Sequence, residues 1–219
     1  MAAWVKICGV TRLDDARAAF DAGADAIGIN FWPRSKRYCE PPRARGIVAG
    51  LAPGALVYGV FVGASRDEIA AVVRDVGLTG VQFHGGEPAS DAEGWDLPVI
   101  RAVAATSREA VSAALETGDR YRFPKAEIGT CPRFPYRVLV DNAAGGGSGQ
   151  TVDAALLDGI DLREAILAGG LTPENVAASV ARFRPFGVDT AGGVETAPGI
   201  KDARKIEAFV REARSSKRT

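Results

Sequence analysis

Lys6-Ile7-Cys8-Gly9-Val10-Thr11 ends a short apolar strand with a thiol and turns at once into a helical pattern over residues 13–22. A side chain at such a junction faces the mouth of an α/β fold. A dinucleotide-binding fold would carry a GxGxxG spacing at this first turn, but the sequence there reads CGVTRLDD. The opening turn therefore favours a different α/β architecture.

Apolar runs of strand length alternate with helical segments along the whole chain, which indicates a parallel sheet. The eight strand candidates are residues 5–8, 26–31, 56–62, 80–83, 98–103, 137–140, 165–168 and 187–190. They predict a single α/β domain over residues 1–219, a (β/α)₈ TIM barrel. An open doubly wound sheet has the same local pattern and is the alternative. Glycine-rich turns after the last three strands favour closure, because sugar-phosphate barrels place their anion site there.

Start signals mark several of the expected helices. Ser65 with Glu68, and Thr106 with Glu109, have the spacing of a capping box. Thr172-Pro173-Glu174 places a cap before a proline, which favours the first helical position. We therefore expect helices to begin directly after residues 65, 106 and 172.

Residues 118–135 (GDRYRFPKAEIGTCPRFP) interrupt this regular order, because they are long for a helix-to-strand connection. Such a connection lies on the N-terminal face of a barrel, whereas barrel chemistry occurs at the opposite face. We predict a surface insertion that holds Cys131 and lies away from the site.

Lys plus Arg and Asp plus Glu are equal at 27 each, so no overall field indicates binding to nucleic acid or an anionic membrane. The N-terminus shows no basic and apolar leader, and no window reaches the length of a membrane helix, so we expect a cytoplasmic protein. Three widely spaced cysteines fit neither a disulfide framework nor a zinc site. We expect reduced thiols and no metal.

Cys8 and Asp141 are the candidate catalytic groups, because each ends or directly follows an apolar strand. A thiol serves as a base only if its surroundings lower its pKa, and a small buried hydrophobe is the alternative for Cys8. A turn or helix cap is the alternative for Asp141. In an eight-stranded barrel their strands are three steps apart, so the two side chains would face one another across one pocket.

Two diglycine turns, Gly169-Gly170 and Gly192-Gly193, offer backbone N–H groups to an anion and are the candidate phosphate site. The loop Phe31-Trp32-Pro33-Arg34-Ser35-Lys36-Arg37-Tyr38 mixes cations with aromatic rings, which suits an aromatic carboxylate. Solvated surface cations are the alternative there. His84 directly follows the fourth strand, and Gln82 lies close to it within that strand. Both are candidate substrate-binding residues, with a local hydrogen bond as the alternative.

Six motifs occur together and in order: KICGVT, FWPRSKRY, VQFHGGE, LVDN…GGSGQ, LAGGLTPENV and GVETAPGIKD. Together they resemble the phosphoribosylanthranilate isomerase family of tryptophan biosynthesis. The resemblance runs over residues 5–213, and only residues 118–135 fall outside it. It implies a (β/α)₈ barrel that isomerises N-(5-phosphoribosyl)anthranilate, an aldose, to 1-(2-carboxyphenylamino)-1-deoxyribulose 5-phosphate, a ketose, without metal or organic cofactor.

The resemblance also implies roles for individual residues. Cys8 would be the general base and Asp141 the general acid. Arg37 would bind the anthranilate carboxylate, the two glycine turns the phosphate, and Asp189 a sugar hydroxyl. The partner would then be a small phosphosugar, and the sequence leaves open whether the chain is a monomer or a homodimer.

Two rival functions remain at this point. A related sugar-phosphate isomerase, such as that of histidine biosynthesis, uses two aspartates, whereas the first strand here ends in Cys8. A phosphate-ligand binding barrel with a structural thiol would not be an enzyme at all.

Overall fold

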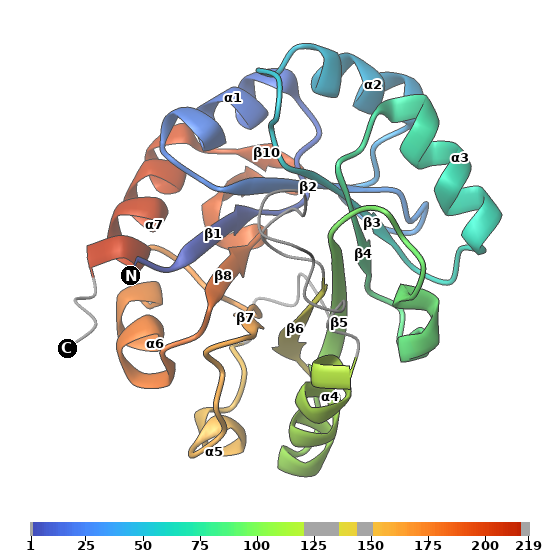
Figure 1. Cartoon of the computed structure of the whole chain (residues 1–219). Coiled ribbons are helices and arrows are strands. Elements are labelled where there is room, and N and C mark those ends of the chain that lie inside the picture. Colours follow the sequence, from blue (N-terminus) through green and yellow to red (C-terminus); the bar gives the residue numbers. More distant parts are fainter. Residues whose placement is uncertain (1, 121–135, 144–150, 216–219) are drawn as a thin grey trace.

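The computed structural model describes residues 2–120, 136–143 and 151–215, and its eight main strands form a closed parallel barrel (Figure 1). The strands are β1 (Trp4–Ile7), β2 (Ala26–Asn30), β3 (Val57–Phe61), β4 (Gly80–Phe83), β5 (Val99–Ala105), β6 (Tyr136–Asn142), β7 (Ile166–Leu167) and β8 (Gly187–Thr190). Closure comes from β1 pairing with β8, in a register that sets Lys6 beside Asp189. The predicted strands and the barrel are confirmed, and the open sheet is excluded.

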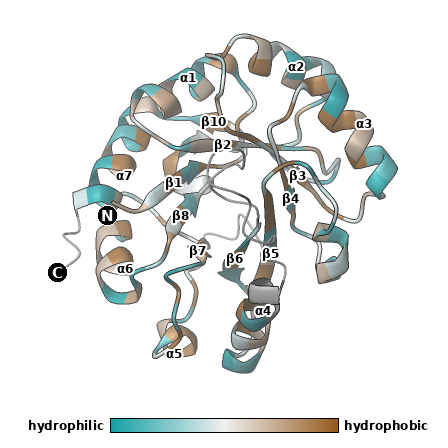
Figure 2. Ribbon diagram, in the orientation of Figure 1, coloured by the Kyte–Doolittle hydropathy of each residue, from teal (hydrophilic) through white to brown (hydrophobic). Residues whose placement is uncertain are grey.

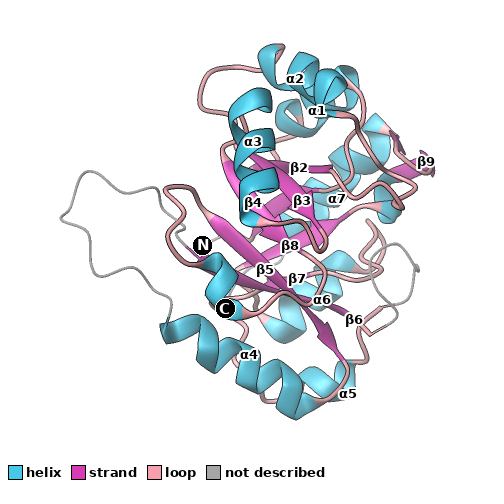
Figure 3. Ribbon diagram, turned by 90° about the vertical axis from the view of Figure 1, so that its right-hand side faces the viewer, coloured by secondary structure: helices cyan, strands magenta, loops and turns pink. Residues whose placement is uncertain are grey.

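Helices surround the barrel, as the side view in Figure 3 shows. They are α1 (Leu13–Asp21), α2 (Pro41–Ala49), α3 (Arg66–Val76), α4 (Arg108–Arg120), α5 (Ala154–Leu157), α6 (Val176–Phe183) and α7 (Ala203–Ser215). The connection between β4 and β5 contains the 3₁₀ turn η1 (Ala89–Ala92), and η2 (Gly192–Val194) follows β8. A short antiparallel hairpin, β9 (Glu195–Ala197) with β10 (Ile200–Lys201), precedes α7 and was not predicted.

Side chains alternate along each strand between two apolar regions. On β1, Val5 and Ile7 belong to the large cluster between the strands and the helices, whereas Trp4 belongs to a smaller cluster inside the barrel. Figure 2 shows the corresponding hydrophobic strands and the hydrophilic outer faces of the helices. Lys6 lies on the same side of β1 as Trp4, so it carries a charge into the barrel interior.

The helix starts differ in part from the predictions. The Ser65 hydroxyl accepts from the Glu68 N–H, and the Glu68 carboxylate accepts from the Ser65 N–H, so this capping box is confirmed. The box predicted at Thr106 is wrong, because Ser107 Oγ accepts from the Ala110 N–H at 3.1 Å and α4 begins one residue later.

The start predicted after Thr172 is also too early. The Thr172 hydroxyl accepts from the Glu174 N–H, but this contact closes a turn rather than a helix. Helix α6 begins at Val176, with Asn175 as the preceding cap residue.

The expected insertion at residues 118–135 is described only at its beginning. Helix α4 continues through Arg120, so residues 118–120 belong to a helix and not to a loop. Residues 121–135, including Cys131, lie outside the described residues, as does the glycine-rich stretch within 144–150.

Two further features are absent from the described ranges. None of the helices within them combines the length and apolar character that crossing a bilayer requires. No three His, Cys, Asp or Glu side chains in the same ranges gather closely enough to hold a metal ion. Cys8 and Cys39 are free thiols.

Candidate active site

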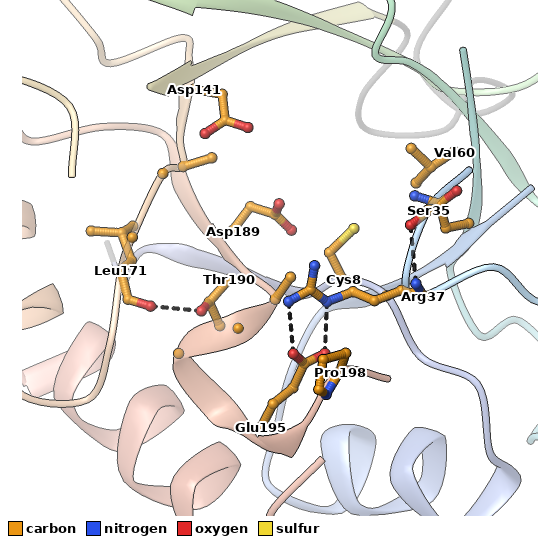
Figure 4. A pocket seen from close by; sticks show the side chains of 18 of the residues that line it. Cys8, Ser35, Arg37, Val60, Asp141, Leu171, Asp189, Thr190, Glu195 and Pro198 are labelled. Atoms are coloured by element: carbon orange, nitrogen blue, oxygen red, sulfur yellow. Dashed lines mark hydrogen bonds and ion pairs between the residues drawn. The ribbon is translucent and has the colours of Figure 1, made fainter. Parts of the chain in front are cut away.

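A cavity of about 740 Å³ opens at the carboxyl ends of the barrel strands (Figure 4). All of the predicted site residues except Gln82 line it. They are Cys8, Arg37, His84, Asp141, Gly169, Gly170, Asp189, Gly192 and Gly193. Parallel strands in a barrel end at the same face, which explains why residues from distant parts of the sequence meet there.

Cys8 directly follows β1, and its thiol points into this cavity (Figure 4). Its backbone N–H donates to the Thr190 carbonyl at 2.8 Å, which ties the end of β1 to β8. Burial raises the pKa of the thiol above its ordinary value, and the positive charges of Lys6 and Lys201 offset part of this rise. At neutral pH the thiol form therefore predominates, in contrast to the lowered pKa expected of a catalytic thiol, and the thiolate is a minor form that the charges of Lys6 and Lys201 favour.

Asp141 lies in β6, three strands from β1 by way of β7 and β8. Its carboxylate is 7% exposed and has a fixed orientation. Oδ1 accepts from the Asn142 backbone N–H at 2.8 Å and from its side-chain amide at 3.2 Å. Oδ2 lies 3.2 Å from His84 Nε2. A Cβ at Gly169 would lie 2.9 Å from Oδ1, so the glycine leaves room for the carboxylate.

Gln82 and His84 form a hydrogen-bonded pair on the Asp141 side of the cavity. Gln82 Nε2 lies 3.0 Å from His84 Nδ1, and the Gln82 side chain is fully buried behind the ring. When the Gln82 amide donates to Nδ1, the imidazole proton resides on Nε2 and faces Asp141. His84 thus lines the cavity, whereas the Gln82 side chain, among the described residues, contacts His84 and does not line it.

Arg37 lies in the loop after β2, and its side chain packs against Gly9. Its Nε and Nη2 donate to the two carboxylate oxygens of Glu195 at 2.8 and 2.7 Å. The Ser35 hydroxyl accepts from the Arg37 backbone N–H at 3.1 Å. The guanidinium is therefore held in one orientation, with its remaining nitrogen on the side away from Glu195 (Figure 4).

The two glycine turns meet at the end of the cavity beside β7 and β8. Gly169 and Gly170 have φ values of 79° and 61°, in the left-handed region that glycine adopts without strain. The Thr190 hydroxyl donates to the Leu171 carbonyl at 2.7 Å, which joins the two turns. A Cβ at Gly193 would lie only 2.0 Å from that carbonyl oxygen, so this contact requires glycine.

The chain as a whole resembles known proteins. A family model described as N-(5'phosphoribosyl)anthranilate (PRA) isomerase matches residues 5–212. The chain belongs to this family. The N-(5'-phosphoribosyl)anthranilate isomerase of Myxococcus xanthus is 44% identical, with 98% of each chain covered. That of Pseudomonas fluorescens Pf0-1 is 42% identical and covers 95% of this chain and 97% of its own.

Solved structures of the PRA isomerase family have the same fold. That of the Thermotoga maritima enzyme has a TM-score of 0.80 and 35% identity, covering 97% of this chain and 99% of its own. A phosphoribosyl anthranilate isomerase in complex with reduced 1-(o-carboxyphenylamino)-1-deoxyribulose 5-phosphate is equally similar, with a TM-score of 0.80 and 35% identity over the same shares of the two chains.

Three charged residues near this PRA isomerase site were not predicted from the sequence. Lys6 is fully buried, and its Nζ lies 2.9 Å from Asp189 Oδ1. Glu195 and Lys201, from the unpredicted hairpin, form a second buried pair at 2.9 Å. A charged residue inside an otherwise apolar run was the available signal for Lys6. Glu195 and Lys201 look like ordinary solvated loop residues in the sequence.

Proposed function

We propose that this chain converts N-(5-phosphoribosyl)anthranilate to 1-(2-carboxyphenylamino)-1-deoxyribulose 5-phosphate by general acid–base catalysis, with Cys8 as the base and Asp141 as the acid. One observation carries the proposal. A thiol directly after β1 and a carboxylate from β6 face the same cavity, which is also lined by Arg37 and by two glycine turns. An aldose-to-ketose shift requires one proton delivered to oxygen and one removed from carbon, which matches these two groups.

In this scheme Asp141 gives its proton to the ring oxygen of the furanose, the C1′–O bond breaks, and the anthranilate nitrogen forms a protonated Schiff base with C1′. The Cys8 thiolate then removes the proton from C2′. The electrons of that C–H bond form the C1′=C2′ double bond of an enolamine, and the π electrons of the C1′=N bond move onto the nitrogen and neutralise it. Tautomerisation of the enolamine gives the ketone. Each step is a proton transfer or a bond rearrangement within the substrate, so the scheme calls for no metal or organic cofactor.

The remaining residues bind the substrate. Arg37 takes the anthranilate carboxylate, Asp189 takes a sugar hydroxyl, and the turns at Gly169-Gly170 and Gly192-Gly193 take the phosphate. His84 contacts the sugar from the Asp141 side. Because Gln82 is buried behind His84, we assign it to holding the ring rather than to direct contact with the substrate.

Anthranilate fluorescence gives the direct test. Addition of the protein to N-(5-phosphoribosyl)anthranilate should abolish the fluorescence of the substrate, and Cys8→Ala should stop this while the variant still binds a reduced product analogue. Cys39→Ala, which replaces a buried thiol outside the cavity, is the matched control and should retain turnover. Undiminished turnover by Cys8→Ala would refute the acid–base scheme, and binding without turnover by the unaltered chain would favour a ligand-binding barrel.

We also propose that the chain acts as a monomer or a homodimer. A related Thermotoga maritima structure concerns monomers of a dimeric phosphoribosylanthranilate isomerase, at 34% identity to this chain. Sedimentation equilibrium over a range of protein concentrations would distinguish the two states, and a larger assembly would contradict both.

A further inference from the structure

A chain of three charged side chains lies beside the cavity. Glu195, at the start of β9, binds Arg37 through both carboxylate oxygens at 2.8 and 2.7 Å. Lys201, at the end of β10, donates to Glu195 Oε1 at 2.9 Å. The Glu195 and Lys201 side chains are only 6% and 0% exposed, whereas Arg37 is 15% exposed and reaches the cavity.

Lys201 has hydrogen-bond partners in addition to Glu195. Its ammonium group has three donors. Besides Glu195, they meet the Cys8 carbonyl at 2.5 Å and the Ala191 carbonyl at 3.0 Å. Burial works against ionisation of Glu195, but the hydrogen bond from Arg37 and the charge of Lys201 hold its pKa below the ordinary value. Glu195 is therefore an anion fixed on both sides.

The geometry leaves one edge of Arg37 available. A guanidinium has five N–H donors, and Glu195 occupies two of them, on Nε and Nη2. Of the other three, one on Nη1 and one on Nη2 form a second edge that Glu195 does not occupy (Figure 4), and the third, also on Nη1, points toward the Cδ side. Two glycines make this position of Arg37 possible. A Cβ at Gly9 would lie 2.4 Å from Arg37 Cδ, and a Cβ at Gly192 would lie 3.2 Å from Arg37 Nη2.

Burying several charges is costly, and an apolar hairpin would avoid that cost. The arrangement does, however, fix a flexible arginine before the substrate arrives, and a preorganised fork loses less entropy on binding a carboxylate. We propose that Glu195, held by Lys201, is a positioning residue that presents the free edge of Arg37 to the anthranilate carboxylate. This inference rests on the role of Arg37 in the proposed function.

Turnover of two substrates distinguishes a positioning role of Glu195 from a general structural role. One is N-(5-phosphoribosyl)anthranilate, and the other is the same glycosylamine made from aniline, which lacks the carboxylate. Each forms by condensation of the amine with ribose 5-phosphate. In Glu195→Gln, kcat/KM for the anthranilate substrate should fall by at least about tenfold relative to that for the aniline substrate. A merely structural role would reduce both by the same factor.

Three further variants complete the experiment. Asp161→Asn breaks an exposed arginine–carboxylate pair with Arg163. It should leave unchanged the ratio of the two kcat/KM values, that for the anthranilate substrate divided by that for the aniline substrate. In an Arg37→Ala background, Glu195→Gln should change the ratio no further, because the group it positions is gone. Glu195→Gln with Lys201→Met removes both members of the buried pair. It should show the same fall in the ratio, and it provides a folded test if the single variant unfolds.

An unchanged ratio in folded Glu195→Gln, or an equal loss for both substrates, would overturn the inference. If Arg37→Ala itself leaves the ratio unchanged, the carboxylate does not bind at Arg37, and the inference falls with that assignment while the isomerase activity stands. If the unaltered chain turns over neither substrate, the proposed function itself is refuted.

Discussion

The ammonium group of Lys6 lies 2.9 Å from the Asp189 carboxylate, inside the barrel and shielded from water. Burial alone would lower the pKa of Lys6, but the charges of Asp189 and Cys8 raise it above its ordinary value. A Cβ at Gly28 would lie 2.8 Å from Cys8 Sγ and 3.0 Å from Lys6 Nζ, so the thiol and the ammonium share the space that this glycine leaves. The proposed base thus has a permanent positive charge beside it.

Replacing Lys6 by Met should raise the pKa of the Cys8 thiol further, because the Lys6 charge lowers that pKa. Alkylation rates measured against pH, with Cys39 and Cys131 replaced, would report this shift. The variant should also lose about 3–5 kcal/mol of unfolding free energy in urea, since Asp189 is left as an unpaired buried charge. Lys6→Met with Asp189→Asn should recover part of that loss. An unshifted thiol pKa would contradict the role of Lys6.

The rate should increase with pH into the alkaline range. Burial holds the pKa of the Cys8 thiol above its ordinary value, and the thiolate is the form that acts as a base. Because kcat/KM reports the ionisations of the free enzyme, it should still rise with pH above neutrality. Folding stability should change in the opposite direction. Because the thiol pKa is higher in the folded state than in the unfolded state, the stability that it contributes is fully present below the unfolded-state pKa. This contribution is lost as the pH rises through the folded-state pKa. A rate that levels off below pH 7 would argue against Cys8 as the base.

Asp141→Asn should lower turnover by about 10²–10⁴-fold, the usual contribution of a positioned acid. Binding of the reduced product analogue should stay within about tenfold, because the lost interaction acts mainly in the transition state. Asp158→Asn, at an exposed pair with Arg182, is the control for removing a carboxylate. Equal losses of binding and turnover in Asp141→Asn would indicate a binding role instead.

Gly193→Ala should push apart the two glycine turns that we propose bind the phosphate. Its Cβ would lie 2.0 Å from the Leu171 carbonyl oxygen, so the backbone must move. We expect a higher KM, weaker inhibition by inorganic phosphate and a lower melting temperature. Gly46→Ala is the matched control, because nothing lies within 4 Å of its Cβ position. It sits within α2 and should stabilise the protein by about 0.5–1 kcal/mol. Unchanged phosphate inhibition in Gly193→Ala would contradict the assignment.

Local patterns were sufficient for the main strands because an apolar run covered by helices is visible in the sequence itself. They were insufficient at the start of α4, where Thr106 and Ser107 are both acceptable caps. The end of β5 decides between them, since the Thr106 N–H donates to the Ala104 carbonyl in a turn and leaves Ser107 to cap the helix. The hairpin of β9 and β10 was missed because its strands are too short to show a period.

Local patterns also predicted some features of the candidate site and missed others. Cys8 and Asp141 were predicted from a local feature, the end of a strand, and their position at the mouth of the barrel follows from it. Gln82 was assigned to the substrate, but its amide is buried behind His84. Strand alternation alone does not tell how far a side chain reaches into the cavity.

The sequence by itself determined the order of strands and helices and the placement of a thiol and a carboxylate at strand ends, because periodicity, caps and turns depend on neighbouring residues. Only the tertiary structure decided which charges meet. Lys6 and Asp189 are 183 positions apart and become neighbours only when β1 pairs with β8. Arg37 meets Glu195 for the same reason, across 158 positions. Closing the barrel buries these groups together, and a charge removed from water requires a partner that no local pattern specifies.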